Sequence, residues 1–119
     1  MARLWLGFMA SGAALAWSVP GAWAMQMMSS FPAAQETVDG RNTQYVVRFD
    51  MLVDHQASRL MIVQNGKIIE MLRPLLRSEP DALAAFAPRL PAGDYRLQWS
   101  ARSSSGETNE GSLPFTVKP

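Results

Sequence analysis

The chain has 119 residues, with 11 Lys and Arg against 10 Asp and Glu, one His and no Cys. This length supports one small domain with one core, and the balanced charge, without a basic cluster, argues against a nucleic-acid partner. The lack of Cys excludes disulfides, thiolate metal ligands and a thiol nucleophile, so a secreted domain of this size must rely on its apolar core.

The first 24 residues have the pattern of a secretory signal peptide. Arg3 supplies a basic n-region, residues 4–17 are apolar, and Ala22-Trp23-Ala24 is an A-x-A cleavage site. The apolar run is too short to span a bilayer comfortably. We therefore expect a signal peptide over residues 1–24, export to the periplasm, and a mature domain over residues 25–119 without a membrane span. Losing Arg3 reduces the basic residues to 10, equal to the 10 acidic ones.

The first half of the mature domain contains alternating apolar and polar residues. A first strand is expected around Ser29-Ser30-Phe31-Pro32, and residues 33–43 indicate a connection with a turn at Asp39-Gly40. Residues 44–51 alternate with the period of a half-buried strand. The apolar face of this predicted strand carries Tyr45, Val47, Phe49 and Met51.

A hairpin is the clearest local signal in the middle of the chain. Residues 52–58 form a predicted loop that holds the only histidine, His55, and two apolar runs over 59–64 and 67–72 flank Asn65-Gly66. Both residues of that pair tolerate positive φ, as a type I′ turn requires. Residues 73–81 contain two prolines and are predicted to be a loop. Residues 82–88 could begin a helical turn, but a short strand fits their position better.

The last part of the chain predicts two strands that return to one core. Between Asp94 and Arg102 the apolar residues alternate with polar ones, and the alternation resumes from Ser112 to Lys118. Residues 103–111 are a predicted polar turn, and Pro114 should lie at an edge or bulge because it cannot donate a ladder hydrogen bond. The apolar faces carry Tyr95, Leu97, Trp99 and Ala101, then Leu113, Phe115 and Val117.

Several short strands with many turns and no convincing long helix predict an all-β fold, a small immunoglobulin-like Greek-key β-sandwich. Gly93-Asp94-Tyr95 resembles the tyrosine corner of such sandwiches, in which the phenol bonds back to the backbone. Trp99 is expected to be a central core residue, and the domain is expected to be a monomer.

The same C-terminal residues resemble a known family. Leu-Pro-Ala-Gly-x-Tyr at residues 90–95, Trp99 four residues later, a Ser-rich turn, Gly111-Ser112 and Phe115-x-Val117 are similar to the end of the CopC-type periplasmic copper-resistance domain. A weaker resemblance continues back to about Ser29. The resemblance implies a Greek-key β-sandwich that binds copper.

The ligands that this resemblance implies for Cu(II) are replaced here. The family pattern has a mature N-terminal His and an Asp-x-His in the turn after the Trp strand. This chain has Met25 at the first mature position and Ser105-Gly106-Glu107 in the turn. A hydroxyl is a poor copper ligand and a carboxylate lacks the copper affinity of an imidazole, so the usual Cu(II) site is dismantled.

Five residues are the candidate metal ligands that remain. The first group is the N-terminal methionines Met25, Met27 and Met28. Soft thioethers suit Cu(I), and a flexible N-terminus could wrap an ion, although these methionines could also be apolar filler. His55 is the only imidazole, and Asp54 could orient it, but a lone loop histidine is more often solvated. Three further methionines, Met51, Met61 and Met71, are interpreted as core packing. The candidate metal ligands are Met25, Met27, Met28, His55 and Glu107.

Two functions of different classes follow. In the first, the protein is a periplasmic copper-binding protein of copper homeostasis with an altered, Met-based site that prefers Cu(I). In the second, it is a metal-free sandwich that works through protein contacts, for instance with an inner-membrane copper transport protein. No catalytic constellation is present in the sequence, so we do not expect an enzyme.

Overall fold

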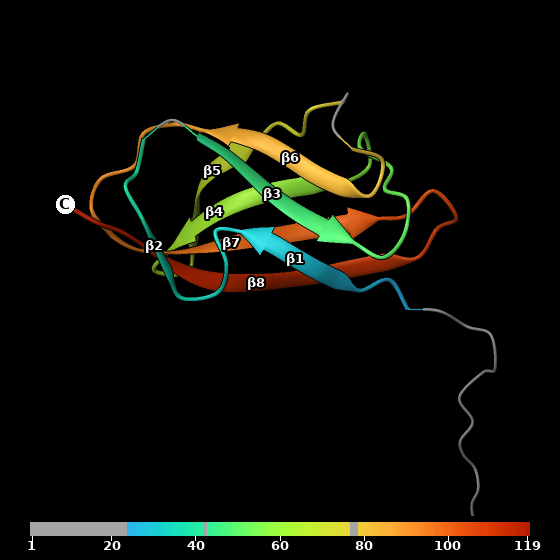
Figure 1. Ribbon diagram of the computed structural model, residues 1–119, viewed down its shortest axis with the longest axis horizontal. Coiled ribbons are helices and arrows are strands. Elements are labelled where there is room, and N and C mark those ends of the chain that lie inside the picture. Colours follow the sequence, from blue (N-terminus) through green and yellow to red (C-terminus); the bar gives the residue numbers. More distant parts are fainter. Residues whose placement is uncertain (1–23, 42, 77–78) are drawn as a thin grey trace, which may run out of the picture.

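A computed structural model describes residues 24–41, 43–76 and 79–119, which form eight strands in two sheets (Figure 1). The predicted signal peptide lies outside these residues, except for its last residue, Ala24. The smaller sheet has the order β1-β3-β6 and the larger one the order β2-β8-β7-β4-β5. The bounds are Met27–Phe31 for β1, Glu36–Val38 for β2, Thr43–Phe49 for β3, Arg59–Gln64 for β4, Lys67–Leu72 for β5, Ala82–Ala87 for β6, Gly93–Arg102 for β7 and Thr108–Val117 for β8.

The predicted all-β sandwich is confirmed, and the described residues contain no helix. All strand pairs are antiparallel except β2, which runs parallel to β8. No helix in the described ranges is long and apolar enough to cross a membrane. The two sheets face each other across one apolar core, as expected for a domain of this length.

The core contains the residues that the period-two pattern assigned to it. The inward residues of β3 from Tyr45 and of β7 from Tyr95 are buried, as are those of β8 from Leu113, whereas the outward residues are polar or partly exposed. Phe115 lies between two phenol rings, edge-on to Tyr45 with a centroid separation of 5.6 Å and stacked on Tyr95 at 5.7 Å. These contacts connect the two sheets through aromatic packing.

Trp99 occupies a space that a glycine leaves open on the neighbouring strand. In the β7–β8 ladder Trp99 lies opposite Gly111, where a Cβ would be 2.6 Å from Cζ2 of the indole. The indole Nε1 donates a hydrogen bond to Oδ1 of Asn109 at 2.7 Å. The predicted core position of Trp99 is therefore confirmed, and its polar atom is satisfied, as buried indoles require.

Two local turn predictions are also confirmed. Asn65 and Gly66 have φ values of 53° and 78°, and they join β4 to β5. The hydroxyl of Tyr95 donates to the carbonyl oxygen of Pro91 at 2.5 Å, which is the predicted tyrosine corner. Residues 82–87 form strand β6, so the strand alternative for this segment was right.

The structure differs from the sequence prediction in three strand details. Residues 36–38 form β2, although no strand was predicted there. The β7–β8 turn is shorter than predicted, because the ladder extends to the pair Arg102 and Thr108. Pro114 lies in an inner strand, but β2 pairs only with residues 115–117, and the Pro114 carbonyl accepts from the Gln35 amide at 2.6 Å. No ladder donor is therefore lost at Pro114.

Candidate metal centre

Three segments that are distant in the sequence meet at one end of the sandwich: the N-terminal segment, the β3–β4 loop and the β7–β8 turn (Figure 1). Asn109 Nδ2 donates to the carbonyl oxygen of Met25 at 2.8 Å. The Ser104 amide donates to Leu52 O at 3.0 Å, and a bridge joins Val53 to Ser103. The candidate residues that the resemblance places at the N-terminus and in the turn therefore do lie at the same end.

Met25 is not part of a flexible end. Its side chain is 1% exposed and belongs to the core cluster. The expectation that the N-terminus from Met25 onward could wrap an ion is wrong for this residue, because burial removes its thioether from the surface. Its backbone is also fixed, since Asn109 holds its carbonyl and the next amide, Gln26 N–H, donates to Asp50 Oδ1 at 2.9 Å.

The next two methionines lie at different depths. Met27 packs against the core and is partly buried, whereas Met28 is 62% exposed. Met27 pairs with Phe49 in the β1–β3 ladder, and Met51 follows Phe49 by two residues and also packs partly buried against the core. Met51, interpreted from the sequence as core packing, is therefore a half-buried thioether at the end of the domain where Met27 lies.

Glu107 is held by two serine hydroxyls from its own turn. Its Oε1 accepts from Ser103 Oγ at 2.6 Å and from Ser105 Oγ. The Ser103 hydroxyl, then that of Ser105, lowers the pKa of Glu107 below its usual value. The carboxylate is therefore ionised at neutral pH, and the stabilisation from these bonds is lost as pH falls through that pKa. Its Oε2 accepts no hydrogen bond within the described part of the chain.

His55 lies in the loop that contacts the β7–β8 turn, but its ring binds another segment. Nε2 is 2.8 Å from the carbonyl oxygen of Ala82 and 3.2 Å from that of Glu79. Carbonyl oxygens accept, so Nε2 carries the proton, and in the neutral ring Nδ1 keeps its lone pair.

Asp54 does not orient His55, which corrects the sequence expectation. Its Oδ1 instead accepts from the amides of Gln56 at 3.1 Å and Ala57 at 3.2 Å, closing the loop turn. Short Asp side chains bond their own backbone two residues on in turns of this kind. Among the described residues, the hydrogen-bond partners of the imidazole are the backbone carbonyl oxygens of Glu79 and Ala82.

Two acids in the segment that accepts from His55 form ion pairs. Arg48 forms ion pairs with Glu79 and with Asp81, the latter at 2.7 Å from Nη1 to Oδ1. The hydrogen bond that Arg48 donates to Glu79 is the main reason that the pKa of Arg48 is raised. These pairs fix the segment that accepts from the imidazole, and they engage the two carboxylates.

The described residues contain no group of three or more His, Asp or Glu side chains that could hold a metal ion. Cu(II) favours nitrogen and oxygen ligands in tetragonal geometry, and the turn offers a single carboxylate, Glu107, with no imidazole beside it. The residues present therefore do not fit the usual Cu(II) site. They fit a soft ion better, because two partly buried thioethers and one exposed thioether lie at this end.

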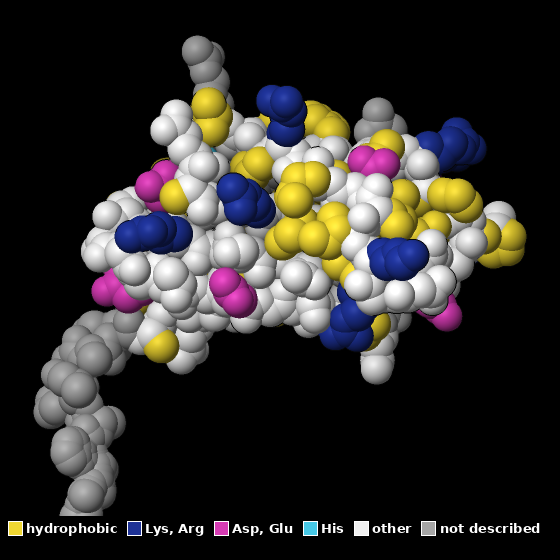
Figure 2. All heavy atoms as spheres, turned by 180° about the vertical axis from the view of Figure 1, so that it is seen from behind, with side chains coloured by type: hydrophobic (Ala, Val, Ile, Leu, Met, Phe, Trp, Pro, Cys, Tyr) yellow, Lys and Arg dark blue, Asp and Glu magenta, His cyan; other side chains and the backbone are white. Residues whose placement is uncertain are grey.

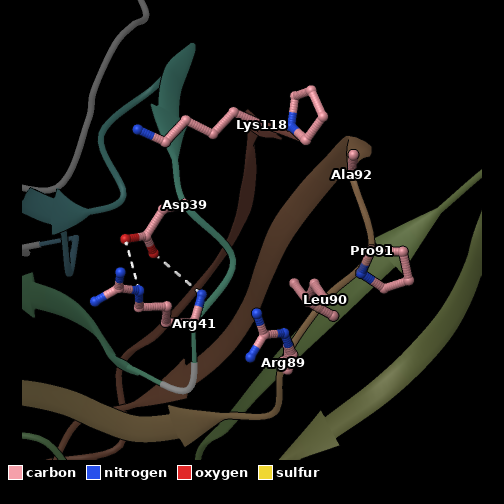
Figure 3. Close-up of a pocket in the computed structure, with 8 residues that line it drawn as sticks. Asp39, Arg41, Arg89, Leu90, Pro91, Ala92 and Lys118 are labelled. Carbon is pink, nitrogen blue, oxygen red and sulfur yellow. Dashed lines mark hydrogen bonds and ion pairs between the residues drawn. The ribbon is translucent and has the colours of Figure 1, made fainter.

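A hollow of about 480 Å³ lies at the opposite end of the sandwich (Figure 3). Arg41, Arg89 and Lys118 line it, and the carboxylate of Asp39 binds Arg41 through Nε at 3.4 Å and through the backbone amide at 3.1 Å. Positive side chains repel a metal cation, and no thioether or imidazole lines this hollow. It is therefore not a second candidate metal centre.

The fold is an immunoglobulin-like β-sandwich, because two mainly antiparallel sheets pack on one core and a tyrosine corner is present. The chain belongs to the CopC domain family, which it matches over residues 27–118. The family resemblance seen in the sequence is thus confirmed over residues 27–118.

Solved structures agree with this assignment. CopC from Methylosinus trichosporium OB3b is 27% identical, with a TM-score of 0.73, covering 80% of this chain and 94% of that chain. PcoC, a methionine-rich copper resistance protein from Escherichia coli, is 24% identical, with a TM-score of 0.67, covering 81% of this chain and all of the other, 100%. No curated protein matches the sequence.

Proposed function

We propose that this protein is a periplasmic copper-binding protein that acts in copper homeostasis and resistance. The observation that carries the proposal is membership of the CopC domain family over residues 27–118. The copper resistance named for the structurally similar PcoC agrees with it. The protein acts as a carrier of copper, not as an enzyme.

Cu(I) is the oxidation state that the donors at this end of the domain favour. The end of the domain where the N-terminal segment meets the β7–β8 turn supplies Met27, Met28 and Met51 as soft donors, with Glu107 as a nearby anion. Thioethers suit Cu(I), whereas Cu(II) would need nitrogen ligands that the turn lacks. Met25 is left out of the proposed site because its side chain is buried. His55 is the one imidazole that could complete it, through Nδ1, because Nε2 faces the carbonyl oxygen of Ala82.

Export completes this proposal. Secretion with cleavage after Ala24 would start the mature chain at Met25, the first residue of the core cluster. We expect the intact mass of protein from the periplasmic fraction to match residues 25–119. A product that retains Arg3 and stays in the membrane fraction would contradict cleavage.

An inner-membrane copper transport protein is the proposed partner, since a periplasmic carrier must pass its ion on.

The alternative function is a metal-free sandwich that acts through protein contacts alone, as a monomer. It is favoured by the dismantled Cu(II) site, in which Ser105 and Glu107 replace the Asp and His of the family pattern. Copper binding by the processed protein separates the two functions.

Removal of the three accessible sulfur atoms tests the ligand assignment. We expect the triple variant Met27→Leu, Met28→Leu, Met51→Leu to bind Cu(I) at least about tenfold more weakly, a loss near 1.4 kcal/mol. Leu keeps the size and apolarity of Met, so folding should be little affected. Cu(I) titration of the processed protein measures the change. Met61→Leu, in the other sheet, is the matched control and should bind as the parent does; equal loss in both would refute the assignment.

A further inference from the structure

An apolar surface remains uncovered on the outer face of the larger sheet. Opposite residues of a ladder face the same side, and Met71 lies opposite Met61, while Ile68 lies opposite Val63. Met61 and Val63 are absent from the core cluster, so this row faces outward, but both are 7% exposed, and the open part of the row is its β5 half. Ile68 is 52% exposed and Met71 55% exposed. Met71 is thus not a core residue, which corrects the sequence interpretation.

Unpaired cations surround this apolar row. Arg59 begins β4 and Arg96 lies opposite Val63 on β7, both on the outer face, and Arg73 follows the end of β5. Lys67 begins β5 opposite Gln64, the residue after Val63, so its register places it on the other face. Within the described residues the ion pairs of Lys and Arg involve only Arg41 and Arg48. Figure 2 shows hydrophobic side chains gathered on this side of the molecule, with Lys and Arg, and also Asp or Glu, beside them. The surface therefore offers apolar contact with a positive rim.

The row also borders a free sheet edge. β5 is the last strand of the larger sheet, and among the described residues it pairs with β4 alone, so one side of its backbone has no strand partner there. Glu70, the one acid of β5, lies opposite the core residue Ile62 and therefore on the other face. Hollows lie beyond both ends of the row, one of about 290 Å³ beside Val63 and Arg96 and one of about 350 Å³ beside Met71 and Arg73.

We propose that the free edge of β5 binds an extended polypeptide segment as an added strand, with apolar residues at its centre and carboxylates at both ends. The segment pairs with the β5 backbone and lays its outward side chains against Ile68 and Met71. Its carboxylates meet Arg73 on the outer face and Lys67 on the other face, and these two residues are about 20 Å apart at roughly 3.3 Å per residue. The charge of the surface thus selects an acidic partner.

This occupant fits better than two others. A second copy of the chain, paired antiparallel edge to edge, would bring Lys67 towards Arg73 of its partner, and like charges repel. An anionic membrane would satisfy the positive rim and the apolar row, but lipids cannot continue the hydrogen-bond ladder at the β5 edge. A polypeptide strand satisfies all three features.

A designed peptide tests the proposal. The probe has alternating Val and Thr at its centre and two Asp at each end, and it is added to isotope-labelled protein beginning at Met25. We expect amide shifts and slowed hydrogen exchange along β5, and binding weakened about tenfold or more by Ile68→Thr with Met71→Thr. Lys67→Gln with Arg73→Gln should weaken binding too and lose the salt dependence. Leu52→Thr, an exposed apolar residue in the β3–β4 loop, is the control and should bind normally.

Three results would overturn the proposal. They are no binding of the acidic peptide, equal binding of a peptide with Lys in place of Asp, and shifts that lie away from β5. Two further measurements are binding to phosphatidylglycerol vesicles and the oligomeric state of the free protein by sedimentation. Vesicle binding that Ile68→Thr with Met71→Thr abolishes, without peptide binding, would assign the surface to a membrane, and a dimer lost in the same variant would assign it to a second copy. None of these measurements involves copper.

Discussion

Replacing Trp99 by Ala is expected to lower the free energy of unfolding by about 3–5 kcal/mol. The indole is 4% exposed and fills the space over Gly111, so truncation leaves a cavity that the ladder cannot close. It also removes the donor to Asn109, whose amide holds the Met25 carbonyl. A loss of this size is a large part of the roughly 5–15 kcal/mol that stabilises a domain.

Arg96→Ala is the matched control, on the same strand but on its outer face. Arg96 is exposed and bonds the hydroxyl of Ser112 at 2.9 Å, so its removal should cost about 0.5 kcal/mol or less. Denaturant unfolding of both variants measures the difference as a shift in midpoint. Equal midpoints would mean that the assigned faces of β7, and with them its register, are wrong.

Truncation of Met25 has the second largest expected effect. Met25→Ala should lower the free energy of unfolding by about 2 kcal/mol or more, because a fully buried thioether side chain leaves a cavity in the core. The effect should appear in thermal or denaturant unfolding of protein that begins at residue 25. A change within about 0.5 kcal/mol would show that the first residue of the domain is frayed in solution.

Met25→Leu separates packing from ligation at the same position. Leu conserves volume and should cost less than about 1.5 kcal/mol. Since the sulfur of Met25 is buried, Cu(I) affinity should be unchanged in this variant. Loss of Cu(I) binding with full stability would instead place the thioether of Met25 in the metal site.

Most of the fold was predictable because apolar and polar residues alternate along a strand when one of its faces is buried. β3, β7 and β8 each bury one face, and Asn65-Gly66 specifies its hairpin through local backbone geometry. β2 was missed for the opposite reason. Its three residues are too short to show a period, and their partner, β8, is distant in the sequence.

The depth of the methionines was not predictable from sequence. Met71 follows the apolar pattern of a core strand but lies on the outer face at a sheet edge, and the position of β5 in the strand order decides this. Met25 looked like a processed, mobile end, and a long-range bond from Asn109 helps to hold it in the core. The replaced ligands Ser105 and Glu107 could be identified only through the family resemblance.

Competition for each copper ion tests the central claim most directly. Protein that begins at Met25 would be titrated against a Cu(I) chelator under reducing conditions and, separately, against a Cu(II) chelator in air. The thioethers of Met27, Met28 and Met51, and the lack of an imidazole in the β7–β8 turn, predict retention of Cu(I) and loss of Cu(II). Tight Cu(II) binding that the Met→Leu triple variant leaves unchanged would contradict the account, and failure to hold either ion would favour the metal-free interaction module.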